Sequence, residues 1–66
     1  MIKVLLTTGR CTPPLTRTIE CDDVKIQKPY YVKMYDNKHK LIAWAFIDEW
    51  QSIVIEHENG IKQVIK

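Results

Sequence analysis

Four side chains in the sequence belong to the types that ligate transition metals, two cysteines and two histidines. They are Cys11, Cys21, His39 and His57. Structural zinc sites usually take ligands in pairs about two to five residues apart, because one tight turn then orients both. In this chain at least nine residues lie between each candidate and the next. The spacing therefore predicts no metal site, and the sequence indicates no cofactor.

The groups needed for covalent or acid–base catalysis are also poorly placed. The only serine, Ser52, lies in a predicted strand and lacks the strand–turn–helix elbow of a nucleophilic serine. Cys11 follows Arg10, but solvent screens an exposed cation and weakens its influence on the thiol. The adjacent carboxylates at 22–23 and 48–49 point apart in a strand or turn, so they do not readily share a proton. We therefore expect a protein that is not an enzyme.

Lysines and tyrosines interleave in the middle of the chain, a mixture that is typical of nucleic-acid binding. Lysine neutralises phosphates and displaces their counterions, and an exposed tyrosine offers a flat ring on which an unpaired base stacks. In the predicted strand 30–35, alternation places Tyr31, Lys33 and Tyr35 on one face. The residues expected to bind nucleic acid are Lys25, Lys28, Tyr31, Lys33, Tyr35 and Lys38.

The same residues have a simpler interpretation, an ordinary solvated sheet face stabilised by cross-strand pairs. Arginine, the residue most used to read bases, occurs only at Arg10 and Arg17. A weakly sequence-specific nucleic-acid-binding small β-barrel is therefore the alternative function, and protein binding is favoured over it.

The favoured function is a small non-enzymatic interaction or regulatory module that binds a partner protein. A chain of 66 residues buries little surface, so an unknown protein partner or a second copy of the chain would add stability. Trp44 is expected in the core, whereas Trp50 has polar neighbours and is expected to be partly exposed. The contacts are expected at the loop after the first strand, at Trp50 and at an edge strand near the C-terminus. The named contact residues are Arg10, Cys11, Pro13, Pro14 and Trp50.

A single domain, residues 1–66, would position these side chains on short strands. Residues 2–7 alternate in polarity like a strand with one buried face, and glycine and prolines make residues 8–16 a loop. Residues 17–27 contain two short strands or one bent strand. Residues 41–47 are apolar throughout, which is typical of a central strand covered on both faces. With five to six short strands, the mainly β chain is expected to form a small curled antiparallel sheet or an SH3-like barrel.

The segment 48–57 has two interpretations. Asp48 and Gln51 have the spacing of a helix cap and its partner, which indicates one short helix. Ile53, by contrast, begins a β-branched triplet with poor helix propensity, and Asn59 with Gly60 is a strong hairpin signal. A hairpin is the favoured interpretation.

Composition and charge set the broader class. The hydrophobic fraction is 45%, as in a globular chain, and the net charge is +2. Residues 1–40 hold eight basic and four acidic side chains, whereas residues 41–66 hold two basic and four acidic ones, so the two parts carry +4 and −2. The longest apolar stretch, 41–47, is far shorter than the roughly 20 residues that cross a bilayer. With no apolar signal-peptide core, a cytoplasmic protein with reduced thiols and no membrane contact is expected.

Overall fold

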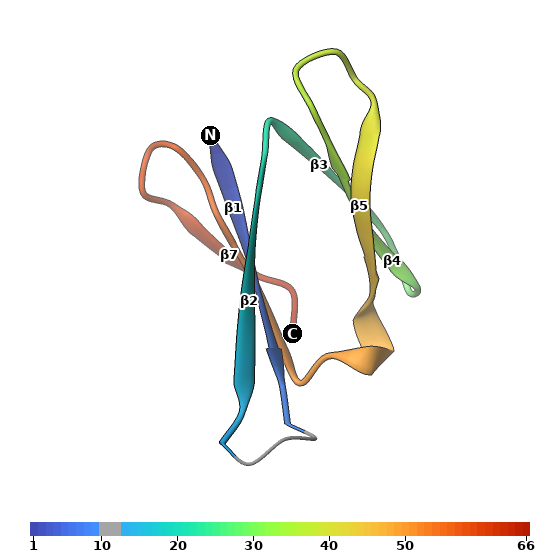
Figure 1. Cartoon of the computed structure of the whole chain (residues 1–66), viewed down its shortest axis with the longest axis vertical. Helices are drawn as coiled ribbons and strands as arrows, with labels where there is room; N and C mark the ends of the chain where they lie inside the picture. The colour runs from blue at the N-terminus through green and yellow to red at the C-terminus, as the bar shows by residue number, and fades with distance from the viewer. Residues whose placement is uncertain (10–12) are drawn as a thin grey trace.

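The computed structural model describes residues 1–9 and 13–66, which form seven short strands and one turn of 3-10 helix. The bounds are β1 Ile2–Thr8, β2 Leu15–Cys21, β3 Asp23–Gln27, β4 Tyr31–Tyr35, β5 Leu41–Phe46, η1 Ile47–Glu49, β6 Ser52–Glu56 and β7 Lys62–Val64. They build two antiparallel sheets, a four-stranded sheet of order β2-β1-β6-β7 and a three-stranded sheet of order β3-β4-β5. Figure 1 shows the two sheets as separate groups of strands.

Alternation of polarity explains the four-stranded sheet. In β1 the side chains of Val4 and Leu6 are buried, whereas Lys3 is exposed. The register sets Val4 opposite Ile55 and Leu6 opposite Ile53, both buried in β6. Because residues directly opposite each other point to the same face, the two central strands present one apolar inner face.

The three-stranded sheet supplies the other half of the core. Val32 and Met34 of β4 are fully buried, and they lie opposite Ala45 and Ala43 of β5. The inner faces of the two sheets share one apolar cluster, so each sheet has one buried face and one outer face. The buried members of this cluster are Val4, Leu6, Cys21, Val32, Met34, Ala45, Ile53 and Ile55.

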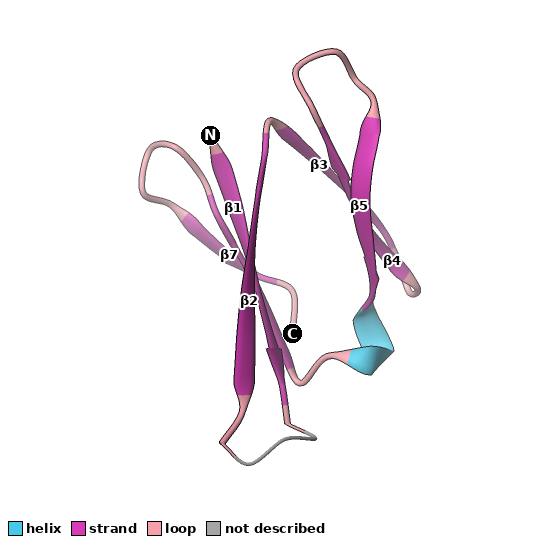
Figure 2. Ribbon diagram, in the orientation of Figure 1, coloured by secondary structure: helices cyan, strands magenta, loops and turns pink. Residues whose placement is uncertain are grey.

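The chain passes between the sheets at two places. Strand β2 turns sharply into β3 at Asp22, and η1 leads from β5 back to β6. The whole three-stranded sheet is therefore one continuous stretch of chain, inserted between the strands of the other sheet. Figure 2 shows η1 at the foot of β5, before the chain returns to the four-stranded sheet.

The mainly β class is confirmed, but the sheets do not close into a barrel. The bend at Asp22 folds the next three strands over the others as a second layer. The described residues therefore form two packed sheets with seven strands in total, whereas one curled sheet of five or six strands was predicted. The segment 17–27 does contain two strands.

The hairpin predicted in the C-terminal part is confirmed, and the alternative helix over 48–57 is wrong. Helical geometry is limited to η1, and Ser52–Glu56 is strand β6, as its β-branched residues favour. Gly60, with φ of 83°, takes the left-handed conformation that the β6–β7 turn requires.

Candidate functional site

The outer face of the three-stranded sheet gathers aromatic and basic side chains from all three strands. The register sets Lys25 opposite Lys33, Lys33 opposite Trp44, and Tyr31 opposite Phe46. These residues alternate with the buried ones, so they share the face that points away from the core. The surface made by Lys25, Tyr31, Lys33, Tyr35, Trp44 and Phe46 is called the aromatic face below.

Three rings of the aromatic face are in mutual contact. The centroids of Tyr31 and Phe46 lie 4.9 Å apart, those of Trp44 and Phe46 lie 5.1 Å apart, and those of Tyr31 and Trp44 lie 6.0 Å apart. The indole of Trp44 stands nearly perpendicular to the ring of Phe46, at 89°. Such edge-on packing stabilises the cluster and leaves ring surface free. Trp44 is 54% exposed, so its indole is available to a ligand.

Two lysines flank the rings. The Nζ atom of Lys25 lies 5.6 Å from the centroid of Tyr35, and that of Lys33 lies 5.8 Å from the centroid of Tyr31. Both distances are within the range of cation–π contacts. In the part of the chain that the structure describes, neither ammonium group forms an ion pair with a carboxylate. Asp23, opposite Tyr35, instead accepts a hydrogen bond from the backbone N–H of Val24 at 2.9 Å.

The structure brings together four of the six residues predicted to bind nucleic acid, namely Lys25, Tyr31, Lys33 and Tyr35. The other two, Lys28 and Lys38, are exposed in the turns at opposite ends of β4, so they border the aromatic face. Sequence reasoning missed Trp44 and Phe46. The prediction of Trp44 in the core is wrong, because β5 is an edge strand whose outer face is uncovered.

The residues predicted to contact a protein partner are less concentrated. Arg10 and Cys11 lie outside the described residues. Pro13 and Pro14 are exposed, whereas Trp50 is half-buried and packs against the core. Trp50 therefore offers only part of its indole to a partner.

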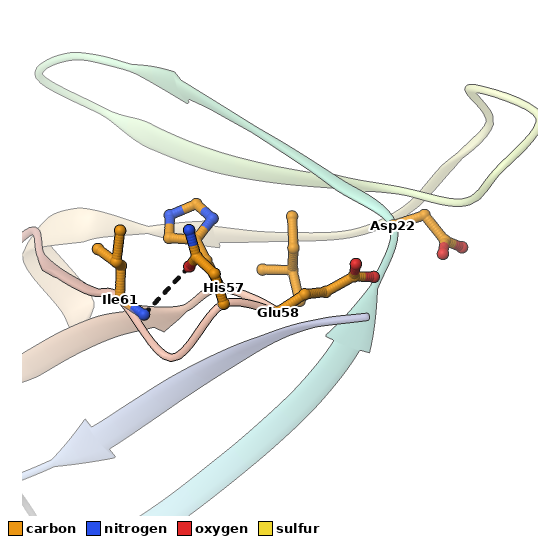
Figure 3. Close-up of a pocket in the computed structure, with 6 residues that line it drawn as sticks. Asp22, His57, Glu58 and Ile61 are labelled. Atoms are coloured by element: carbon orange, nitrogen blue, oxygen red, sulfur yellow. Dashed lines mark hydrogen bonds between the residues drawn. The ribbon is translucent and has the colours of Figure 1, made fainter.

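A polar pocket lies where the β6–β7 turn meets the corner after β2 (Figure 3). It is lined by Ile2, Asp22, His57, Glu58, Asn59 and Ile61. The titratable groups do not converge, because His57 Nε2 bonds Gln63 Oε1 at 3.3 Å and Glu58 forms an ion pair with the amino group of Met1. Asp22 points away from the imidazole in Figure 3. Among the described residues that line this pocket, no nucleophile is paired with a base.

Cys21 is a free, buried thiol at the end of β2. Burial raises the pKa of this thiol, and the neighbouring carboxylates of Asp22 and Asp23 raise it further. The protonated form is therefore favoured, which makes the thiol a poor nucleophile. Across residues 1–9 and 13–66, no three histidine, cysteine or acidic side chains are grouped closely enough to hold a metal ion.

No helix within the described ranges is long and apolar enough to cross a membrane. Comparisons with models of protein families, with curated proteins and with solved structures found no match to this chain.

Proposed function

We propose that the protein binds single-stranded nucleic acid on the aromatic face, with little preference for sequence. The observation that carries the proposal is the pairing of Lys25 directly opposite Lys33 beside a cluster of rings in which Trp44 is exposed and Tyr31 and Phe46 are half-buried. Two cations in this position repel each other and destabilise the sheet. A phosphate backbone passing over them would neutralise both charges and release its counterions.

The rings supply the second part of the interaction. Each base has a flat face, and stacking on an aromatic side chain contributes about 1–3 kcal/mol per base whatever the base is. Trp44 has the largest ring system on the face and is well exposed, so it is the expected main stacking platform. The described part of the face carries lysines and no arginine, which supports phosphate contact more than the reading of base edges.

An anisotropy titration tests the proposal with labelled oligothymidylate, oligouridylate and a DNA duplex of equal length. We expect both single strands to bind at low salt, with the logarithm of the association constant falling linearly as the logarithm of salt rises. The duplex should bind less well, because its bases are already stacked on one another. Failure of either single strand to bind at low salt, or equal binding of the duplex, would contradict the proposal.

Binding of a partner protein is the second candidate. It is favoured by the exposed apolar side chain of Leu15, which follows the exposed Pro13 and Pro14. The loop between β1 and β2 covers residues 9–14, because β2 already begins at Leu15. Affinity capture from cell extract with the parent chain, and with a variant in which residues 9–14 are shortened, tests this role. We expect the shortened chain to lose the captured protein, and unchanged capture would remove this loop as the contact. Circular dichroism would verify that the shortened chain is folded.

A further inference from the structure

Strand β5 differs from the other edge strands of the protein. It pairs only with β4, and none of its residues, Leu41–Phe46, is charged. The three other edge strands each carry at least one charged side chain: β2 has Arg17 and Glu20, β3 has Asp23 and Lys25, and β7 has Lys62. Charged residues on an edge discourage pairing with another chain. The edge of β5 lacks this protection.

The backbone of β5 is also free to pair. Just beyond β5, the N–H of Ile47 donates to the carbonyl of Tyr30, the residue before β4, at 2.9 Å, so the backbone groups of Ile47 point toward β4. Hydrogen-bonding direction alternates along an antiparallel strand, so the backbone groups of Trp44 and Phe46 point to the open side. Within the described ranges, no backbone hydrogen bond joins β5 to any strand except β4. These donors and acceptors are available to another strand.

We propose that β5 pairs antiparallel with β5 of a second copy of this chain, around a two-fold axis at Trp44. This register sets Ile42 opposite Phe46 of the second copy and Ala43 opposite its Ala45. The two three-stranded sheets become one continuous sheet of six strands. The two-fold axis is perpendicular to the sheet, so both aromatic faces lie on the same side.

The charges at the two ends of β5 favour this occupant. Lys38 and Lys40 precede the strand, and Asp48 and Glu49 follow it, all of them exposed. Asp36 lies at the basic end, and Lys66 Nζ donates to the carbonyl of Ile47 at the acidic end, at 3.2 Å, but each end keeps an excess of one sign. In the antiparallel dimer the basic end of one copy meets the acidic end of the other, so Lys40 faces the helix η1 of the second copy, which carries Asp48 and Glu49. Parallel pairing would instead set like charges together. An edge with one basic and one acidic end is therefore complementary to itself.

Lys25 and Lys33 of the two copies would lie too far apart in this dimer to repel each other strongly. Lys33 lies one strand from the open edge and Lys25 lies two strands from it. With strands about 4.8 Å apart, the two Lys25 residues of the dimer would be roughly 24 Å from each other, beyond the screening length at physiological salt. Pairing through β3 would instead bring the charged side chains of two β3 edges together.

Sedimentation velocity of the protein without nucleic acid tests the dimer independently of the proposed function. The parent chain is 7.8 kDa, and we expect a species of twice that mass as its concentration is raised to about 1 mM. Lys40→Glu alone and Asp48→Lys alone should each weaken the dimer about ten-fold, because two end contacts become repulsive. A chain carrying both changes should recover the parent dimer.

Lys25→Glu is the matched control, because it makes the same charge change on the far edge and should leave the dimer intact. Equal mixing of the two single variants should also restore dimers, since each supplies the charge that the other needs. A chain that stays monomeric throughout would overturn the proposal. Single variants that dimerise as well as the parent would do the same, because β5 would then not be the interface. Circular dichroism would verify that every variant is folded.

Discussion

The outer faces of the two sheets differ in the cross-strand pairing of their charged side chains. On the four-stranded sheet Lys3 lies opposite both Glu20 and Glu56, and Glu56 lies opposite Lys62, so each of these four charges has an opposite charge across the strand. On the three-stranded sheet Lys25 and Lys33 face each other. Opposite charges across strands stabilise a sheet and like charges destabilise it.

The uncharged side chains of the two outer faces also differ. The four-stranded sheet fills its outer face with small and branched side chains such as Thr7, Thr16, Ser52 and Val54. The outer face of the three-stranded sheet carries aromatic rings, of which Trp44 is 54% exposed and Tyr31 and Phe46 are half-buried. The first face balances its charges within the protein. The second leaves Lys25 and Lys33 facing each other, and a bound polyanion would neutralise both.

Core truncation should have the largest effect, and it should be similar in the two sheets. Met34→Ala and Ile55→Ala each remove a fully buried side chain, one from each inner face. Each should lower the free energy of unfolding by about 2–5 kcal/mol, measured by urea denaturation. A much smaller loss for Met34→Ala would show that the three-stranded sheet packs loosely, and the contrast would then extend to the core.

Truncation of Trp44 should act mainly on binding, with a smaller loss of stability from its ring contacts with Tyr31 and Phe46. Because this indole is the exposed stacking platform, Trp44→Ala should cost about 1–3 kcal/mol of binding free energy for a single-stranded oligonucleotide. Val64→Ala is the control, since Val64 is 70% exposed on the other outer face. Equal affinities of the two variants in an anisotropy titration would show that the aromatic face is not the site.

Reversal of one lysine on each face should change stability in opposite directions. Lys25→Glu turns a repulsive pair into an attractive one and should raise the free energy of unfolding by about 0.5 kcal/mol, partly offset by loss of the Tyr35 contact. Lys3→Glu faces two glutamates and should lower it by about 1 kcal/mol. Only the first change should weaken oligonucleotide binding and reduce its salt dependence. Destabilisation by both would erase the distinction between the faces.

The smallest expected effect is a pH dependence from Cys21. Its pKa is raised in the folded state, so the folded protein holds the thiol proton more tightly than the unfolded chain does. This contribution is fully present below the pKa of the unfolded thiol and is lost as pH rises through the folded pKa. Denaturation of the parent and of Cys21→Ala across this alkaline range should show a steeper fall for the parent. Parallel curves would contradict the expectation.

Local alternation made part of the aromatic face predictable. Tyr31, Lys33 and Tyr35 were expected on one face because side chains in a strand alternate, and the pairing of β3 with β4 adds Lys25 to them. Strand order explains what was missed. The uniformly apolar segment around Trp44 has no polar residues to indicate its exposed side, so its pattern predicts burial on both faces.

The arrangement of the strands in the two sheets could not be predicted from the sequence. The bend at Asp22 makes two layers out of strands that could have formed one curled sheet, and neither the order of the strands nor the position of β5 at an edge follows from spacing. The turn residues were more informative, because Asn59 and Gly60 have a backbone preference that few other pairs share.

The insertion of one sheet within the other sets an expected order of folding. Strands β3, β4 and β5 are joined by short turns, whereas β1 pairs with β6 across most of the chain, with Lys3 opposite Glu56. Short loops close at a lower entropic cost and therefore earlier. Pulsed hydrogen exchange during refolding should protect the amide of Val32, which pairs with β5, before that of Leu5, which pairs with β6, and the reverse order would contradict this expectation. The three-stranded sheet that bears the rings would then form first, and it would bring β1 and β6 close enough to pair.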